Sequence, residues 1–340
     1  MTIAPLNAVS RKIRPSPLLE FGLTVRGQPR RVFAKAEWVH RSGSIKDRLA
    51  AHVVNRAREE GTLLPGAPIV EASSGNTAIA FASLGAATGH PVTIFMPDWM
   101  SRERTQLLVA FGARVVPVSR EQGGFVGSVA LAHEHALEIG AFEPRQFDNP
   151  WNVETHELGT GVEILRDLAA VGLAPDAFVA GVGTGGTVMG VGRALRSAGC
   201  RARVHPVEPA ESPILTVGHN VGRHRIQGIS DEFVPSIVHL DELDAPLAVS
   251  DRDAIVVAQK MARELGVGVG ISSGANVMAA ILLADELGPD AVVTTVLSDD
   301  HSKYLSTDLF AHETARPGSI AEDVAFRSVR VVEAPVEVAG

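Results

Sequence analysis

Lys46 is the residue whose type and position most directly suggest covalent chemistry. The chain has only five lysines against 26 arginines, and Lys46 lies just inside the expected start of a helix. Ser44 and Asp47 fit the capping pattern S-x-x-D, and apolar residues follow at helical spacing. A lysine amine becomes nucleophilic when it loses its proton and can then form a Schiff base, which arginine cannot do. The alternative is a solvated lysine that opposes the helix dipole in a first turn.

A second group of polar side chains lies at residues 73–77, between an apolar strand pattern and an alanine-rich helix pattern. Gly75 permits tight backbone geometry at this junction. Backbone N–H groups at a helix start, together with nearby hydroxyls, can bind a small anion such as a carboxylate. An ordinary strand-to-helix turn with a capping side chain is the alternative. The candidate substrate-binding residues of this loop are Ser73, Ser74, Asn76 and Thr77.

A third segment, residues 181–187, is rich in glycine and threonine and lies between an expected strand at 177–180 and an expected helix at 188–196. Such a loop is typical of a phosphate cradle. It also satisfies G-x-G-x-x-G, with Glu208 downstream at a strand end, so a nicotinamide cofactor remains an alternative. That alternative leaves Lys46 and the loop at 73–77 unexplained. The candidate phosphate-binding residues are Gly183, Thr184, Gly185, Gly186 and Thr187.

Alternating strand and helix patterns must position these segments. Short β-branched strands are expected at 31–35, 69–72, 92–96, 115–118, 178–181, 204–208 and 292–297, with helices such as 102–111, 251–265 and 275–287 between them. The pattern predicts an α/β fold of two lobes, each an open and mostly parallel sheet flanked by helices. Ligands of such sheets bind beyond the carboxyl ends of strands, here in the cleft between the lobes. We expect one lobe at 40–150, a second at 1–39 with 151–316, and a peripheral tail at 317–340.

Composition excludes several classes of function. A net charge of −8 and the lack of a basic aromatic patch argue against nucleic-acid binding. No apolar stretch reaches membrane length, and the start of the chain lacks the apolar core of a signal peptide. Cys200 is the only cysteine, which excludes an internal disulfide and a cysteine-based zinc site. No metal site is expected, since His133 and His135 are two apart on a helix and point to different faces. We expect a cytoplasmic enzyme.

Together the motifs resemble the cysteine synthase and cystathionine β-synthase family of pyridoxal-phosphate (PLP) enzymes, which have the tryptophan synthase β-type fold. The likeness extends over nearly the whole chain and is greatest to the cysteine synthase branch. Residues 43–48 look like the motif of the cofactor lysine, 73–77 like the substrate-carboxylate loop, and 183–187 like the phosphate loop. Residues 270–275 look like the segment whose first serine, Ser272, faces the pyridine nitrogen. The branch is indicated by Gln146, Phe147, Asn149, Pro150, His156, Thr160 and Gly161.

The resemblance implies β-replacement on an O-activated serine through an aminoacrylate intermediate. Lys46 would hold PLP and then, as a free amine, remove the Cα proton of the substrate. Asn76 would also lie beside the ring hydroxyl of the cofactor. The partners implied are an amino-acid donor and a small nucleophile, in a homodimer. The substrate carboxylate would be bound by Ser73, Ser74, Asn76, Thr77, Gln146 and Gly228.

Departures from the family pattern leave the donor and the nucleophile open. Ser230, Asp231 and Glu232 replace small residues, and Asp299, Asp300 and His301 stand in another variable stretch. The reaction that fits best is that of a cysteine synthase, O-acetylserine plus sulfide giving cysteine plus acetate. The alternatives are an O-phosphoserine donor, a nitrogen nucleophile giving a diaminopropionate-type product, and a serine or threonine dehydratase. From other classes, we weigh an NAD(P) oxidoreductase and a non-catalytic homologue that keeps PLP.

Overall fold

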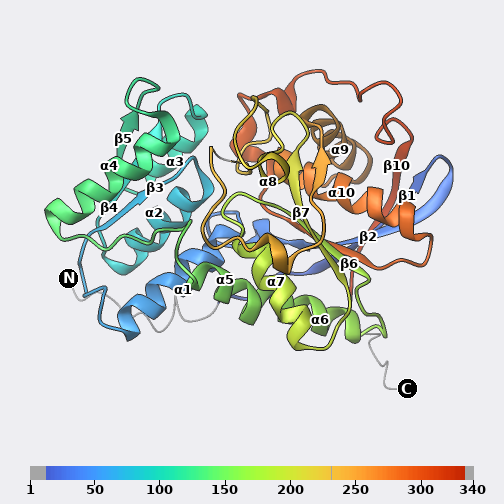
Figure 1. Ribbon diagram of the computed structural model, residues 1–340, viewed down its shortest axis with the longest axis horizontal. Coiled ribbons are helices and arrows are strands. Elements are labelled where there is room, and N and C mark those ends of the chain that lie inside the picture. Colours follow the sequence, from blue (N-terminus) through green and yellow to red (C-terminus); the bar gives the residue numbers. More distant parts are fainter. Residues whose placement is uncertain (1–12, 231, 334–340) are drawn as a thin grey trace.

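Two β-sheets flanked by helices form the described part of the chain (Figure 1). The structure is a computed structural model that describes residues 13–230 and 232–333. Over these residues the larger sheet has seven strands in the order β10-β1-β2-β9-β6-β7-β8, and the smaller has three in the order β3-β4-β5. The fold is therefore the two-sheet α/β fold that the sequence predicts.

The larger sheet is mixed. Strands β2, β9, β6, β7 and β8 run parallel, whereas β1 is antiparallel to both β2 and β10. Strands β1 and β2 form a hairpin whose turn residues Arg26 and Gly27 both have positive φ (49° and 76°), which is a turn geometry that matches the twist of the strands. The strands are β1 (Leu18–Val25), β2 (Gln28–Ala36), β6 (Ala177–Gly181), β7 (Arg203–Pro209), β8 (Leu247–Val249), β9 (Val293–Leu297) and β10 (Val324–Val331).

The smaller sheet is entirely parallel and consists of β3 (Ile69–Ala72), β4 (Val92–Pro97) and β5 (Arg114–Val118). Its side chains alternate between two apolar layers, as the pleat of a strand requires. Ile94 of β4 packs with residues of α1, α2 and α3, whereas Phe95 packs against α4 on the opposite face. Both faces are therefore covered, which is usual for parallel sheets.

Helices cover both faces of the larger sheet as well. In β6, Val179 belongs to the apolar cluster that contains α9 and α10, and Phe178 belongs to the cluster that contains α6 and α7. Figure 1 shows α9 and α10 on one side of this sheet and α6 and α7 on the other. Over the described residues, no helix has both the length and the apolar character needed to cross a membrane. The helices are α1 (Lys46–Glu59), α2 (Asn76–Thr88), α3 (Arg102–Ala110), α4 (Gly124–Ile139), α5 (Trp151–Thr155), α6 (Val162–Ala169), α7 (Gly186–Ser197), α8 (Ile214–Val217), α9 (Asp251–Leu265) and α10 (Ile271–Leu287).

The seven strands predicted from the sequence correspond to β2, β3, β4, β5, β6, β7 and β9, while β1, β8 and β10 were not predicted. The expectation of a peripheral tail after residue 316 needs correction. Strand β10 pairs with β1, and its residues Val324 and Phe326 are buried in the core of the larger sheet. The last residues of the expected tail, 334–340, lie outside the described residues. The lobe boundaries at 39/40 and 150/151 remain our proposal.

Candidate active site

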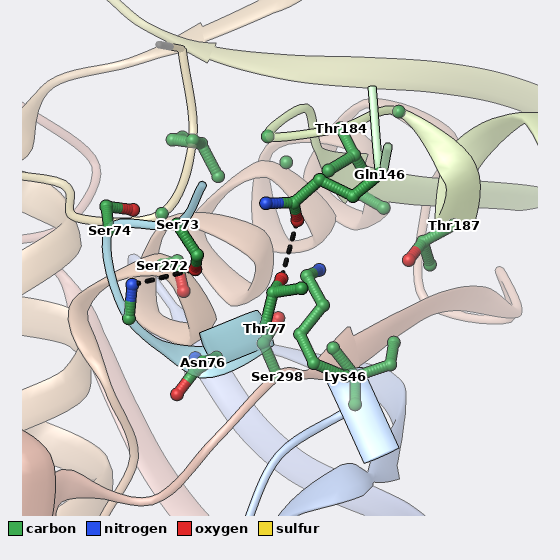
Figure 2. Close-up of a pocket in the computed structure, with 18 of the residues that line it drawn as sticks. Lys46, Ser73, Ser74, Asn76, Thr77, Gln146, Thr184, Thr187, Ser272 and Ser298 are labelled. Atoms are coloured by element: carbon green, nitrogen blue, oxygen red, sulfur yellow. Dashed lines mark hydrogen bonds between the residues drawn. The ribbon is translucent and has the colours of Figure 1, made fainter. Parts of the chain in front are cut away.

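One pocket between the two sheets contains residues of all the motifs found in the sequence (Figure 2). It opens at the carboxyl ends of β3 and β6, where open α/β sheets bind their ligands. Gly186 is the one predicted site residue that does not line it, and it instead begins α7 beside the pocket. The predicted residues that do line the pocket are Lys46, Ser73, Ser74, Asn76, Thr77, Gln146, Gly183, Thr184, Gly185, Thr187, Gly228 and Ser272.

Lys46 is the first residue of α1, and its side chain extends into the pocket (Figure 2). The capping box expected for this helix does not form, because the Ser44 hydroxyl oxygen accepts the N–H of Lys46 at 3.4 Å, whereas the N–H of Asp47 bonds to the Ser44 carbonyl. Asp47 instead accepts hydrogen bonds from the backbone N–H and the hydroxyl of Ser42, at 2.8 and 2.9 Å. Asp47 therefore closes the preceding loop on itself, and this loop presents Lys46 to the pocket. Burial raises the pKa of Asp47, against the lowering effect of the two bonds from Ser42.

Arg48 anchors the start of α1 on the side away from the pocket. This buried guanidinium binds Glu37 at 2.6 Å and Glu163 at 2.7 Å, and so ties α1 to the segment after β2 and to α6. Burial is the largest single influence and would raise the pKa of Glu37, but the charges and hydrogen bonds of Arg48 and His40 together outweigh it and hold the pKa well below its usual range. Breaking such a buried pair would leave an uncompensated charge in the interior. Because that is costly, the two ion pairs hold the start of α1 in place. The backbone that carries Lys46 is therefore fixed on the side away from the pocket.

Loop 73–77 holds its hydroxyl groups in defined roles. The Ser73 oxygen accepts the N–H groups of Gly75 and Ala78, both at 3.1 Å, which leaves its own O–H to donate. The Thr77 hydroxyl donates to Gln146 Oε1 at 2.6 Å, drawn as a dashed line in Figure 2. Gln146 in turn donates to the Ala72 carbonyl at 2.8 Å. This connected network is arranged around a space that an anionic group can enter.

Asn76 is oriented by the buried carboxylate of Asp299, which lies in one of the stretches that depart from the family pattern. The Asn76 Nδ2 atom donates to Asp299 Oδ2 at 2.8 Å, and the Tyr304 hydroxyl donates to the same oxygen at 2.9 Å. The Asn76 Oδ1 atom is buried in the pocket wall and has no hydrogen-bond partner within the described part of the chain. Burial raises the pKa of Asp299, an effect that the neighbouring Lys303 charge opposes. Asp299 thus acts on the pocket by orienting the amide of Asn76.

The glycine-rich loop approaches other backbone too closely for side chains. A Cβ at Gly183 would collide with the carbonyl of Gly228, and one at Gly185 would collide with Val238. Gly185 also has a φ of 86°, which disfavours other residues. Thr184 is fixed by a 2.9 Å bond from Asn152. The loop leads directly into the start of α7, and a helix start can cradle an anion such as a phosphate.

His156 supports this loop from behind and was noted in the sequence only as a sign of the family branch. One ring nitrogen lies 2.9 Å from the Thr160 hydroxyl and the other lies 3.3 Å from the hydroxyl of Thr187. Burial, together with the nearby charges of Lys46 and Arg48, lowers the pKa of His156 to about 3. The imidazole is therefore neutral at ordinary pH and serves to position Thr187.

An outer cavity of about 300 Å³ adjoins the pocket at its mouth. It carries charges of both signs, with Arg104, Arg120 and Arg223 on its wall together with Glu232. Ser230, beside Glu232, is buried and has a positive φ of 49°. Asp231, which the sequence places with these acids, lies outside the described residues. The charged groups of Arg120, Arg223 and Glu232 belong to exposed residues, so the mouth is polar and hydrated.

Several pocket residues were missed by sequence reasoning. Arg104 and Phe125 line both the pocket and the outer cavity, and Asn276 and Ser298 line the pocket wall. Arg104 is buried, and its guanidinium lies 5.2 Å from the Tyr304 ring centroid. A usable signal did exist for Arg104, because it follows the carboxyl end of β4, the edge at which ligands bind. Asn276 and Ser298 carried no comparable signal.

Comparisons with known proteins agree with these features. Residues 9–299 match the family model described as pyridoxal-phosphate dependent enzyme. The chain is 38% identical over 313 residues to the cysteine synthase of Staphylococcus aureus, covering 92% of this chain and all of that one. It is 41% identical over 300 residues to a probable cysteine synthase of Bacillus subtilis, covering 88% and 96% of the two chains. A crystal structure of a hydrogen sulfide-producing enzyme from Fusobacterium nucleatum superposes with a TM-score of 0.92 at 46% identity, covering 96% and 99%.

Proposed function

Since the chain belongs to the family of pyridoxal-phosphate-dependent enzymes, we propose that it makes or breaks the bond between sulfur and the Cβ atom of an amino acid. It is a β-replacement enzyme of the cysteine synthase type, and its substrates are amino acids. The specific reaction that we favour converts O-acetylserine and sulfide into cysteine and acetate. The observation that carries the class of reaction is Lys46 facing a hydrogen-bonded loop built for a small carboxylate. The similarity to cysteine synthases supports the choice of donor and nucleophile.

The residues of the pocket fit PLP. A phosphate needs close backbone approach, and the loop at Gly183 and Gly185 leaves no space for side chains. A ring hydroxyl needs a polar partner, and the buried Oδ1 of Asn76 has none over residues 13–230 and 232–333. Ser272, at the start of α10, offers a hydroxyl to the ring nitrogen rather than a carboxylate. PLP, when bound, withdraws electrons from Cα of the substrate and so makes its proton acidic.

The groups of this chain then have separate roles in our proposal. Lys46 holds the cofactor covalently and, once displaced by substrate, takes the proton from Cα as a neutral base. The O–H of Ser73 and the backbone N–H groups at the start of α2 bind the α-carboxylate. Gln146, held by Thr77 and by the Ala72 carbonyl, fixes one edge of that site. Positioning the substrate so that the Cα–H bond faces Lys46 supplies much of the expected rate.

A second candidate is the reverse use of the same site, in which cysteine is the donor and sulfide leaves. Two observations favour it. The Fusobacterium nucleatum protein, at 46% identity, is a hydrogen sulfide-producing enzyme. Glu232 also places a carboxylate at the mouth, where it offsets part of the positive charge of Arg104, Arg120 and Arg223 and so makes the mouth less favourable to an anion such as HS⁻. In this direction a second nucleophile replaces the thiol on Cβ.

A donor-by-nucleophile matrix with product detection by mass spectrometry tests both candidates. O-acetylserine, O-phosphoserine, cysteine, serine and threonine serve as donors, and sulfide, water, ammonia and thiols serve as nucleophiles. We expect cysteine from O-acetylserine with sulfide, or sulfide release from cysteine with a replaced β-substituent. Release of pyruvate or 2-oxobutyrate from serine or threonine without incorporation of any nucleophile would contradict the proposal and identify a dehydratase. The homodimer and the cytoplasmic location remain predictions.

A further inference from the structure

A second cavity, of about 310 Å³, lies behind the active-site pocket, between helix α4 and the segment 143–148. We call it the α4 cavity. Its walls are mostly apolar and include Val126 and Val129 of α4. At roughly 30 Å³ per water molecule in the liquid, its volume would accommodate a small organic molecule. It is distinct from the pocket of Lys46, although Phe147 lines both.

The α4 cavity contains a buried acid that the proposed reaction does not use. Glu71 of β3 is only 3% exposed and belongs to the cavity wall. Its Oε1 accepts the N–H of Ala72 at 2.9 Å, but its Oε2 has no hydrogen-bond partner among the residues that the structure describes. A buried polar atom left unpaired is destabilising by about 1–3 kcal/mol. A hydrogen-bond donor supplied by a ligand would remove that penalty.

The other polar groups of this cavity favour a positive ligand. Glu143 and Asp148 contribute two more carboxylates, one of them bound by His133 at 2.8 Å and the other by Arg145 at 3.2 Å. The second of these pairs is exposed, so it neutralises the cavity only weakly. Two aromatic rings also line the cavity, Phe147 and Phe233, with centroids 5.1 Å apart. Acidic groups and aromatic faces together are the usual surroundings of an organic cation.

We propose that the α4 cavity binds a small organic cation whose hydrogen-bond-donating head meets Glu71 and whose apolar body packs on Phe147 and Phe233. An amidinium, a guanidinium or a primary ammonium group shares this chemistry. The apolar walls with one buried acid are what a small-molecule site requires. Only Ala72 separates Glu71 from the substrate loop at 73–77, and the Ala72 carbonyl accepts a hydrogen bond from Gln146. The occupant of the α4 cavity would therefore lie close to the substrate-binding groups.

Benzamidine and benzamide test this proposal with the PLP-loaded enzyme. The two have nearly the same shape, but only benzamidine is cationic, and neither forms the imine with PLP that a primary amine would form. Isothermal titration calorimetry should give an affinity for benzamidine at least about tenfold higher than that for benzamide. Equal affinities, or no binding of benzamidine at millimolar concentration, would overturn the proposal.

Three variants locate the binding site. Glu71→Gln keeps the size of the side chain but removes its charge, and should weaken benzamidine binding by about tenfold to hundredfold. Val126→Trp should exclude both compounds by filling the cavity from a residue that is 49% exposed, so this variant tests the site even where Glu71→Gln folds poorly. Glu138→Gln is the matched control on the exposed side of α4 and should change nothing. Benzamidine affinity that is unchanged in both cavity variants would place binding elsewhere and refute the assignment.

Proton release provides a readout that a structural role for Glu71 would not produce. Burial, together with the charges of Glu143 and Asp148, raises the pKa of Glu71 to about 8, although the backbone N–H groups of Ala72 and Gln146 act to lower it. The carboxyl is therefore mostly protonated at pH 7, and a cation bound beside it should expel up to about one proton. Titrations in buffers of different ionisation enthalpy measure this number. The release should disappear in Glu71→Gln, and wild-type binding without any release would contradict contact with Glu71.

Discussion

The floor of the pocket and its mouth differ in how firmly their side chains are held. On the floor, Thr77, Gln146 and Asn76 are each bound to another buried group. At the mouth, Arg120, Arg223 and Glu232 are exposed residues around a hydrated cavity. A fixed floor suits a reaction that depends on geometry, and a solvated mouth can change its charge without disturbing the fold. We infer that the floor determines the class of reaction and that the mouth selects among substrates.

The largest effect is expected from substitutions of Lys46. Lys46→Ala should reduce turnover by at least about 10³-fold, because it removes both the attachment point of the cofactor and the base that takes the Cα proton. Lys46→Arg is the matched control, since it retains the charge but cannot form a Schiff base, and it should lose as much activity. Steady-state kinetics give the rates, and thermal unfolding checks the fold. If Lys46→Arg keeps wild-type activity, Lys46 acts only through its charge.

Gly185 tests whether the glycine-rich loop holds the cofactor phosphate. In Gly185→Ala the new Cβ overlaps Val238, so the loop must shift and PLP should bind at least about tenfold more weakly, which is a loss of about 1.4 kcal/mol. Gly199→Ala introduces the same strain of a positive φ at a place with no neighbour within 4 Å. Equilibrium dialysis should show weaker retention of PLP only in the first variant. Equal retention in both, or tight NAD(P) binding in the absence of PLP, would favour a dinucleotide.

His156 makes the floor sensitive to acid. Its pKa is about 3 in the folded protein against 6.5 for an ordinary histidine, so the unfolded chain binds the extra proton between these values. The free energy of unfolding should therefore rise with pH through this window, by up to about 1.4 kcal/mol per pH unit from this one group, and become flat above it. In His156→Asn this slope should decrease, as measured by urea unfolding at several pH values. A slope unchanged by the substitution would mean that His156 takes up a proton without unfolding.

Substitutions at the mouth should change the reaction rate least, and this change should depend most on salt concentration. Replacing Asp231 and Glu232 by their amides should speed the reaction with anionic nucleophiles such as sulfide by about twofold to fivefold. The effect should decrease as ionic strength rises. Glu121→Gln, beside Arg120 but not part of the cavity lining, is the control. Stopped-flow spectra separate the two half-reactions, and a change confined to the donor step would mean that these acids interact with the leaving group instead.

The sequence predicted the floor better than the mouth for a physical reason. Lys46, the loop at 73–77 and the glycine-rich loop lie at strand-to-helix junctions, where local spacing determines both the backbone and the direction of the ligand. Long-range contacts were out of reach, and the bond between Asn76 and Asp299 joins residues 223 positions apart. A local pattern can also be misleading, since Asp47 fits a capping pattern but its carboxylate accepts a hydrogen bond from Ser42.

The strands of the fold were predicted with the same limit: local patterns were visible in the sequence, and pairings between distant segments were not. Central strands such as β6 are short runs of buried apolar residues and were found. Strand β10 was missed because only its first half faces the core, and it pairs with β1 about 300 residues earlier. An edge strand of this kind owes its structure to its partner rather than to its own pattern.

Reduction of the purified protein with borohydride, followed by peptide mapping, tests the central claim most directly. Reduction fixes covalently bound PLP to its lysine. Among the described lysines, Lys35 lies in ion pairs with Glu163 and Asp167, Lys260 and Lys303 donate to backbone carbonyls, and Lys46 lines the pocket. We predict that the label will be found on the peptide that contains Lys46. A label on Lys35, Lys260 or Lys303 would contradict the assignment of the active site.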